Sequence, residues 1–128
     1  MNNAVRINVG DILTRPKFPG VDHMGVFAGN NLVCHNTPDK GEHISTVQEF
    51  ADGQPMKVQR TGADASKTIP RINQRLANPK RYDLFRRNCQ HTANEIVYGV
   101  AKSPIVAAIL FALALLLAGM LVRRLVRA

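Results

Sequence analysis

The chain has 128 residues, with 17 Lys and Arg against nine Asp and Glu, which gives a net charge of +8. This length allows one compact domain and excludes two. The positive charge suits a polyanionic partner, but few aromatic residues, no dense Lys/Arg run and no zinc-finger spacing argue against nucleic acid, so we expect anionic lipid as the partner.

The N-terminal residues, MNNAVRINVGD, lack the apolar stretch of a signal peptide. The two cysteines, Cys34 and Cys89, are too few for a disulfide framework. Both features predict a reducing compartment, and we expect the N-terminal domain to lie in the cytosol.

Short strands are predicted in the first third of the chain. Residues 6–13 (RINVGDIL) have the composition of a strand with a break at Gly10-Asp11, and the Pro and Gly residues between 16 and 20 predict a loop. Residues 23–28 (HMGVFA) and 32–35 (LVCH) are two strand-like runs on either side of Gly29-Asn30-Asn31, which is a good hairpin signal.

Helices are predicted mainly in the second half. The pattern indicates a short helix over 47–51 with Ser45 or Thr46 as its cap, a strand over 56–60, an amphipathic helix over 69–77, and a helix over 89–99 with Asn88 as its cap. We therefore predict an α+β fold, in which a small antiparallel sheet packs against the helix that begins at Cys89.

Residues 104–122 (PIVAAILFALALLLAGMLV) carry no charge. A helix of this length spans about 28 Å, close to the hydrocarbon thickness of a bilayer, and a domain this small has no room to bury a helix that is apolar on every side. The sequence thus divides into a folded domain at 1–103, a transmembrane anchor at 104–122 and a short basic tail at 123–128. The basic residues on both sides of the anchor leave its orientation ambiguous.

Cys89 is the strongest candidate for a nucleophile. An ordinary thiol is mostly protonated at neutral pH, and the dipole and free N–H groups of a helix N-terminus favour its thiolate. The same N–H groups can hold the oxyanion of a tetrahedral intermediate, and Arg86 and Arg87 add positive charge nearby. Cys34 lies in a predicted strand and is expected in the core.

The hairpin decides how His23 and His35 are related. A three-residue loop, Gly29-Asn30-Asn31, pairs Ala28 with Leu32 and puts both histidines on one face, whereas a two-residue loop separates them. On one face, one imidazole can orient the other as the third member of a triad does. Without such pairing, a histidine in a strand is more often a structural residue.

The remaining Cys and His residues do not indicate a metal site. Cys34 and His35 are adjacent on a strand and point apart, Cys89 and His91 diverge on a helix, and the sequence has no CxxC pair. We expect no metal and no cofactor. His43 and His91 are interpreted as surface residues or as residues that support the site from behind.

Two stretches, GDIL…VDHMGVFAGNNLVCH and RNCQHTANEIVYG, resemble the lecithin–retinol acyltransferase and H-Ras-like suppressor phospholipase family, a permuted branch of the NlpC-type papain-like thiol enzymes. The resemblance runs in order over roughly residues 8–100, and a C-terminal hydrophobic anchor is similar too. It implies Cys89 as the acyl-accepting nucleophile, His23 as the general base and His35 as the residue that orients His23.

The activity that the resemblance implies is phospholipase A-type cleavage of a glycerophospholipid, or transfer of its acyl group to an amine, an alcohol or a lysolipid. The sequence departs from the family pattern at Met24, where an aromatic residue is usual, and in the motif Asn88-Cys89-Gln90-His91-Thr92, where Asn-Cys-Glu-His-Phe is common. The segment between His35 and Cys89 is also shorter than in vertebrate members. These differences bear on the acyl acceptor and the lipid preference.

Two other functions use the same residues. A membrane-bound cysteine peptidase or amidase, as in many NlpC-type relatives, would share the acyl-enzyme chemistry, and the anchor is what favours lipid over peptide. A non-enzymatic basic membrane adaptor with an idle thiol becomes the better interpretation if His23 and His35 lie on different sheet faces.

Overall fold

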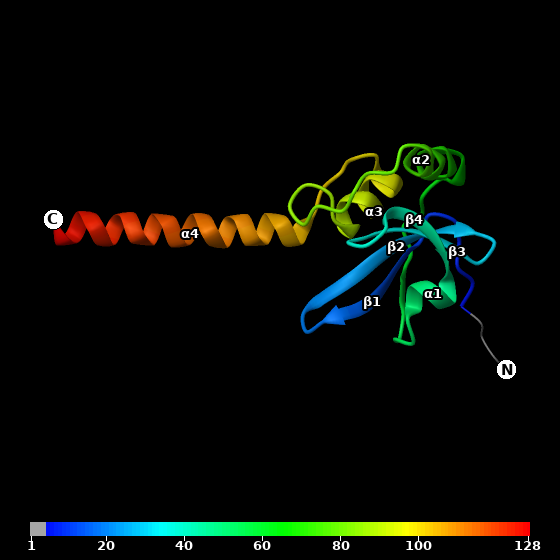
Figure 1. Cartoon of the computed structure of the whole chain (residues 1–128), viewed down its shortest axis with the longest axis horizontal. Coiled ribbons are helices and arrows are strands. Elements are labelled where there is room, and N and C mark those ends of the chain that lie inside the picture. Colours follow the sequence, from blue (N-terminus) through cyan, green and yellow to red (C-terminus); the bar gives the residue numbers. More distant parts are fainter. Residues whose placement is uncertain (1–4) are drawn as a thin grey trace.

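The computed structural model describes residues 5–128, and it has an α+β fold built on one antiparallel sheet (Figure 1). Five strands are arranged in the order β4-β3-β2-β1-β5. The elements are β1 (Ile12–Phe18), β2 (Val21–Gly29), β3 (Leu32–Thr37), β4 (Gly41–Thr46), α1 (Val47–Ala51), β5 (Lys57–Gln59), α2 (Ala65–Ala77), α3 (Cys89–Tyr98) and α4 (Pro104–Arg127). The predicted fold class is confirmed.

The first strand begins later than the sequence indicates. β1 starts at Ile12, because the residues before it form a turn in which the Asp11 carboxylate accepts the Asn8 N–H at 2.9 Å. β1 then continues through Pro16, where a loop was predicted. Proline is tolerated there because β5 pairs only with Ile12–Thr14, so the strand has a free edge at this point.

The β2–β3 hairpin has the predicted register but not the predicted turn. Its turn is the two-residue Asn30-Asn31, with φ values of 50° and 61°, and Gly29 pairs with Leu32. A bulge between Phe27 and Gly29 supplies the extra residue, so that Gly25 pairs with His35 as a three-residue loop would require. The predicted loop was therefore wrong, and the bulge restores the register that it implied.

The sheet separates two apolar clusters. Met24, Val26 and Cys34 face α3 and pack with Ala93 and Ile96 on that helix. On the opposite face, Leu13, Val33 and Phe50 of α1 form the second cluster. Alternation along β2 places His23, Gly25 and Phe27 on the α1 face. The histidines and the Cys89 helix therefore lie on opposite faces of the sheet.

The helices follow their predicted positions with one shift. The Thr46 and Glu49 side chains form a capping box at the start of α1. α2 begins at Ala65, four residues before the predicted start, because Asp64 caps it, and it accommodates Pro70 in its interior. Asn88 caps α3 as predicted, and Gly99 ends it in the left-handed conformation.

α4 extends from the domain as a single exposed helix (Figure 1). Its apolar residues are almost all exposed, and by length and composition it can cross a membrane. It is not a core helix, because the core of a soluble protein would bury it.

Candidate active site

Cys89 is the first residue of α3, held there by a well-formed cap. The Asn88 side chain accepts the Gln90 N–H at 2.9 Å and the His91 N–H at 3.2 Å, and His91 Nδ1 accepts the Asn88 N–H at 3.1 Å. This reciprocal arrangement satisfies three backbone donors and leaves the Cys89 N–H at the free end of the helix. His91 is thus a buried capping residue.

His23 and His35 lie side by side on the same sheet face. His23 Nε2 and His35 Nδ1 are 2.8 Å apart, and both rings are in contact with the ring of Phe50, each at 5.2 Å between centroids. Gly25 between them has no room for a side chain, since a Cβ there would lie 2.8 Å from the Phe50 ring. The shared face, on which the catalytic interpretation depends, is present.

A hydrogen-bond chain runs from His23 through His35 to Ser45. In the tautomer that leaves a base at the outer end of this chain, Ser45 Oγ donates to the Thr46 carbonyl at 3.3 Å and His35 Nε2–H donates to Ser45 Oγ at 2.8 Å. His35 Nδ1 is then an acceptor, and His23 Nε2–H donates to it. The remaining nitrogen, His23 Nδ1, carries a lone pair and is a free base.

Burial keeps both imidazoles neutral. It lowers the pKa of His23 from 6.5 to about 4 and that of His35 to about 3, with further lowering from Arg15 and His43. His43 lies against His35, with ring centroids 4.2 Å apart. At neutral pH the pair is therefore an uncharged base with its oriented partner.

The Cys89 thiol is protonated at rest. Burial raises its pKa, and this outweighs the backbone N–H of Met24, the Lys17 charge and the helix N-terminal N–H groups, all of which favour the thiolate. The predicted lowering by the helix N-terminus exists, but it does not decide the direction. Arg87 contributes little charge here because it forms ion pairs with Glu42 and Glu95.

Met24 brings the thiol next to the strand that carries the base. Its backbone N–H lowers the pKa of the Cys89 thiol, and Met24 directly follows His23. β2 pairs with β3 only from Gly25 onward, so at His23 its pairing is with β1 alone within residues 5–128. In this part of the chain the thiol makes no hydrogen bond to either imidazole, and the predicted approach of His23 to Cys89 stays a prediction.

A small pocket of about 80 Å³ opens at Cys89. Its walls come from β1, the segment before α3 and the start of α4, and they include Phe18, Tyr82, Leu84 and Ile105. The lining is largely apolar, which suits the chain of an acyl group. Burial raises the pKa of Tyr82, and the nearby Cys89 thiolate raises it further.

A buried ionic network fixes the segment that leads into α3. The Glu42 carboxylate accepts Arg87 Nε at 2.7 Å, Thr92 Oγ1 at 2.9 Å and the Lys80 N–H at 2.8 Å. Asn36 Nδ2 donates to the Arg87 carbonyl at 2.9 Å. β3 and β4 thereby hold both sides of the Cys89 turn.

Cys34, the second cysteine considered in the sequence, lies in the apolar core. Cys34 is fully buried in the core, as predicted, and burial raises its pKa to about 12, so it is inert. The His, Cys, Asp and Glu side chains of residues 5–128 form no cluster that could hold a metal ion.

Sequence reasoning missed Ser45, Phe50 and Glu42. Ser45 and Phe50 were seen only as parts of a helix start, because their contacts with His35 arise from strand pairing and chain reversal. Glu42 lies in β4, which was not predicted, and its partner Arg87 is 45 residues away. His35 and Asn36 are consecutive residues of one strand, so alternation predicts that their side chains point to opposite faces of the sheet. No other local pattern indicated these contacts.

Comparison with known proteins identifies the family of the domain. A family model described as Lecithin retinol acyltransferase matches residues 5–102, which include both histidines and Cys89. No curated protein matches the chain.

Proposed function

Because the chain belongs to the lecithin retinol acyltransferase family, whose members are acyltransferases and phospholipases, we propose that it is a membrane-anchored thiol enzyme acting on glycerophospholipid esters. The observation that carries this proposal is the hydrogen-bond chain from His23 through His35 to Ser45, which ends one residue before Met24. The backbone N–H of Met24 favours the thiolate of Cys89. The adaptor alternative is the better interpretation only if His23 and His35 lie on different sheet faces, and the two rings share one face.

In the first step, His23 Nδ1 takes the proton of the Cys89 thiol as the sulfur attacks the ester carbonyl carbon. The carbonyl π electrons move to oxygen, and the Cys89 backbone N–H at the start of α3 stabilises that oxyanion. When the tetrahedral intermediate collapses, the C–O bond breaks and the leaving lysolipid oxygen takes the proton from His23. The product is a thioester on Cys89.

In the second step, water, an amine, an alcohol or a lysolipid attacks the thioester. His23 removes the proton of the acceptor and returns it to the departing sulfur, which restores the thiol. The net result is hydrolysis or acyl transfer with no change of oxidation state. His35 orients His23 in both steps and shares its positive charge through the bond to Ser45.

His23 and Cys89 are both neutral at rest, so the imidazolium–thiolate ion pair forms only during the reaction. The Lys17 charge and the Met24 N–H favour the thiolate at that moment, and the His35–Ser45 chain favours the imidazolium. For this step His23 Nδ1 must reach the sulfur past the end of the β2–β3 pairing, where Met24 adjoins Cys89. A His23 ring that stays on the α1 face in a complex with bound substrate would contradict its assignment as the base.

The membrane anchor supports a lipid substrate. α4 is apolar and exposed, and its first turn lines the same pocket as Cys89 through Ile105. Anchoring raises the effective concentration of the active site at the lipid surface. We expect the domain to lie on the cytosolic side, and protease protection in sealed vesicles tests this orientation.

The direct test is mass spectrometry of the full chain after mixing with phosphatidylcholine vesicles. We expect a peptide containing Cys89 that has gained one acyl group through a thioester, removable by hydroxylamine. The Cys34→Ser protein should keep the adduct and the Cys89→Ala protein should lose it. Turnover of vesicle lipid without any adduct that depends on Cys89 would overturn the proposal.

A further inference from the structure

Large apolar side chains are exposed at the end of the domain from which α4 leaves. Phe18, at the end of β1, is 57% exposed, and Leu84 and Phe85, in the segment before α3, are 49% and 51% exposed. Figure 1 shows the β1–β2 turn and the segment between α2 and α3 reaching toward the α4 side of the domain. Scattered apolar residues need no explanation, but a group at one end marks an interaction surface.

Two of these side chains also belong to the Cys89 pocket. Phe18 and Leu84 line it together with Ile105 of α4. The apolar rim therefore surrounds the opening through which a substrate reaches the thiol. A protein partner bound to this rim would block access to the pocket, whereas a lipid layer would deliver lipid substrate to it.

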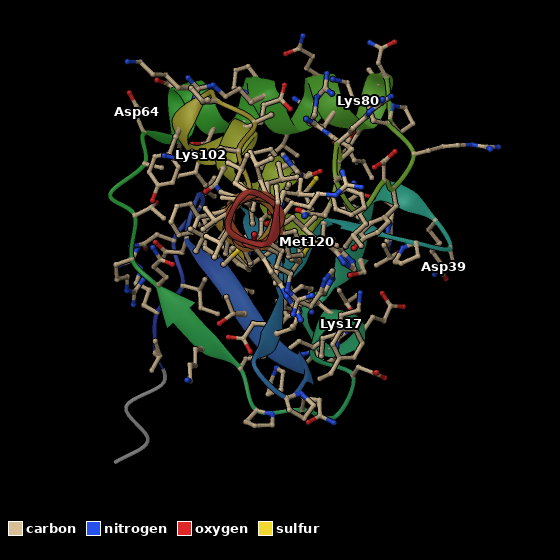
Figure 2. All side chains as sticks on the ribbon, turned by 90° about the vertical axis from the view of Figure 1, so that its left-hand side faces the viewer. Lys17, Asp39, Asp64, Lys80, Lys102 and Met120 are labelled. Carbon is tan, nitrogen blue, oxygen red and sulfur yellow. The ribbon has the colours of Figure 1, made fainter. Side chains whose placement is uncertain are left out.

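Basic groups accompany the rim. Lys17 Nζ lies 5.4 Å from the Phe18 ring and 5.6 Å from the Tyr82 ring, and Lys102 Nζ lies 6.0 Å from the Tyr98 ring. In Figure 2, which looks along α4, Lys17 and Lys102 lie on different sides of the helix. Aromatic rings paired with Lys and Arg are typical of the interface between lipid headgroups and acyl chains.

Hydrogen bonds fix the start of α4 against the Cys89 turn. Gln90 Oε1 accepts Ser103 Oγ–H at 2.5 Å and the Ile105 N–H at 3.0 Å, and Asn88 Nδ2 donates to Ser103 Oγ at 2.9 Å. Gln90 thus satisfies a backbone donor in the first turn of α4, as a cap does. A helix that spans a bilayer will therefore hold this end of the domain at the bilayer surface.

We propose that Phe18, Leu84 and Phe85 form a rim that inserts into the bilayer around the mouth of the Cys89 pocket, so that a lipid passes from the membrane into the site without crossing water. The inference rests on the proposed membrane function. The rim residues lie in the outer part of the acyl-chain layer of the bilayer, and Lys17 and Lys102 contact anionic headgroups.

The chain has no Trp, so a single substitution provides a clean reporter. The full-length Phe85→Trp and Phe18→Trp proteins are reconstituted in phosphatidylcholine–phosphatidylglycerol vesicles that contain lipids brominated at shallow or deep positions of the chain. The Cys89→Ala background prevents turnover. We expect blue-shifted emission and stronger quenching by shallow than by deep bromines, since interfacial groups lie about 5–10 Å inside the boundary.

Two control reporters separate the possible failures. Ile69→Trp, at a residue of α2 with similar exposure at 43%, should emit at long wavelength and resist quenching. Leu113→Trp, in the middle of α4, should be quenched best by deep bromines. Deep quenching at Leu113 without quenching at Phe18 or Phe85 overturns the inserted rim and leaves the anchor in place.

Absence of quenching at Leu113→Trp instead refutes the transmembrane anchor and, with it, the basis of the inference. Blue-shifted emission of Phe85→Trp that bromolipids do not quench identifies a contact with a second copy of the chain and also overturns the rim. Equal quenching of Phe85→Trp and Ile69→Trp also overturns the rim, because it would show that contact with lipid is not confined to this end of the domain.

Discussion

Mild acid should destabilise the domain through its two buried histidines. In the folded state the pKa values of His23 and His35 are about 4 and about 3, whereas both are 6.5 in an unfolded chain. Between these values the unfolded state binds protons that the folded state excludes, so stability is complete above pH 6.5 and falls as the pH decreases toward 4.

The size of the effect follows from proton linkage. From pH 6.5 to pH 5, each histidine that stays neutral in the folded state costs about 1.7 kcal/mol, or about 3 kcal/mol for the pair. This window lies above the ordinary range of carboxyl groups. Against a typical stability of about 5–15 kcal/mol, the loss is easily measured. Burial lowers the pKa of His91 too, which adds a background in the same direction.

The assay is urea unfolding of the full chain in uncharged detergent, followed by near-UV circular dichroism at several pH values. The His35→Asn protein should lose at least half of the pH dependence, because one titrating ring is gone and the other is less confined. Cys34→Ser is the matched control, since a buried hydroxyl lowers stability by about 1–3 kcal/mol without an acid titration. Equal pH slopes in wild type and His35→Asn would refute the reasoning.

Four further outcomes follow from the site. Cys89→Ser should fold normally and lose turnover on vesicles, whereas Cys34→Ser should lose stability more than rate; retained hydrolysis in Cys89→Ser contradicts the nucleophile assignment. Ser45→Ala removes one hydrogen bond, about 1 kcal/mol, and should lower kcat by roughly fivefold with KM nearly unchanged; a change in KM alone would argue for a substrate contact. Truncation after Ser103 should spare hydrolysis of soluble short-chain esters and remove most activity on bilayers, and full activity on bilayers would contradict the anchor. Gln90→Ala should reduce vesicle activity and Gln90→Glu should preserve it, because a carboxylate still accepts at the start of α4; equal loss in both would show that the contact is not the cause.

Features governed by neighbouring residues could be predicted from the sequence. Asn88 before an apolar stripe predicts the start of α3, and Thr46 with Glu49 gives the capping box of α1. Nineteen uncharged residues predict α4. In each case the decisive contacts lie within one or two helical turns, so the information is local.

Features governed by strand geometry were only partly predictable. The hairpin register depends on the total number of extra residues, which can lie in the turn or in a bulge. Asn30 and Asn31 both adopt positive φ and form a two-residue turn, and the extra residue moves to the bulge near Gly29. The shared face of the histidines was thus predicted with the wrong turn.

Long-range polar contacts were beyond prediction. Arg86 and Arg87 are equivalent as sequence, yet Arg87 is buried against Glu42 and Arg86 is not part of that network. The identity of the partner depends on β4 lying next to β3, which no local pattern specifies. The expected positive potential at Cys89 therefore came from Lys17 of β1 instead.

The sheet divides the proposed reaction into two separately supported halves. The α1 face sets the proton positions and basicity of His23 through His35, Ser45 and Phe50, in a dry environment where a charged imidazole is disfavoured. The α3 face sets the position of Cys89 through the cap and the Glu42 network, next to the start of α4. The two halves adjoin at Met24, where the pairing of β2 with β3 has ended and the backbone N–H favours the thiolate of Cys89. In the proposed reaction this N–H would stabilise the thiolate as it forms, at the residue that separates the two halves.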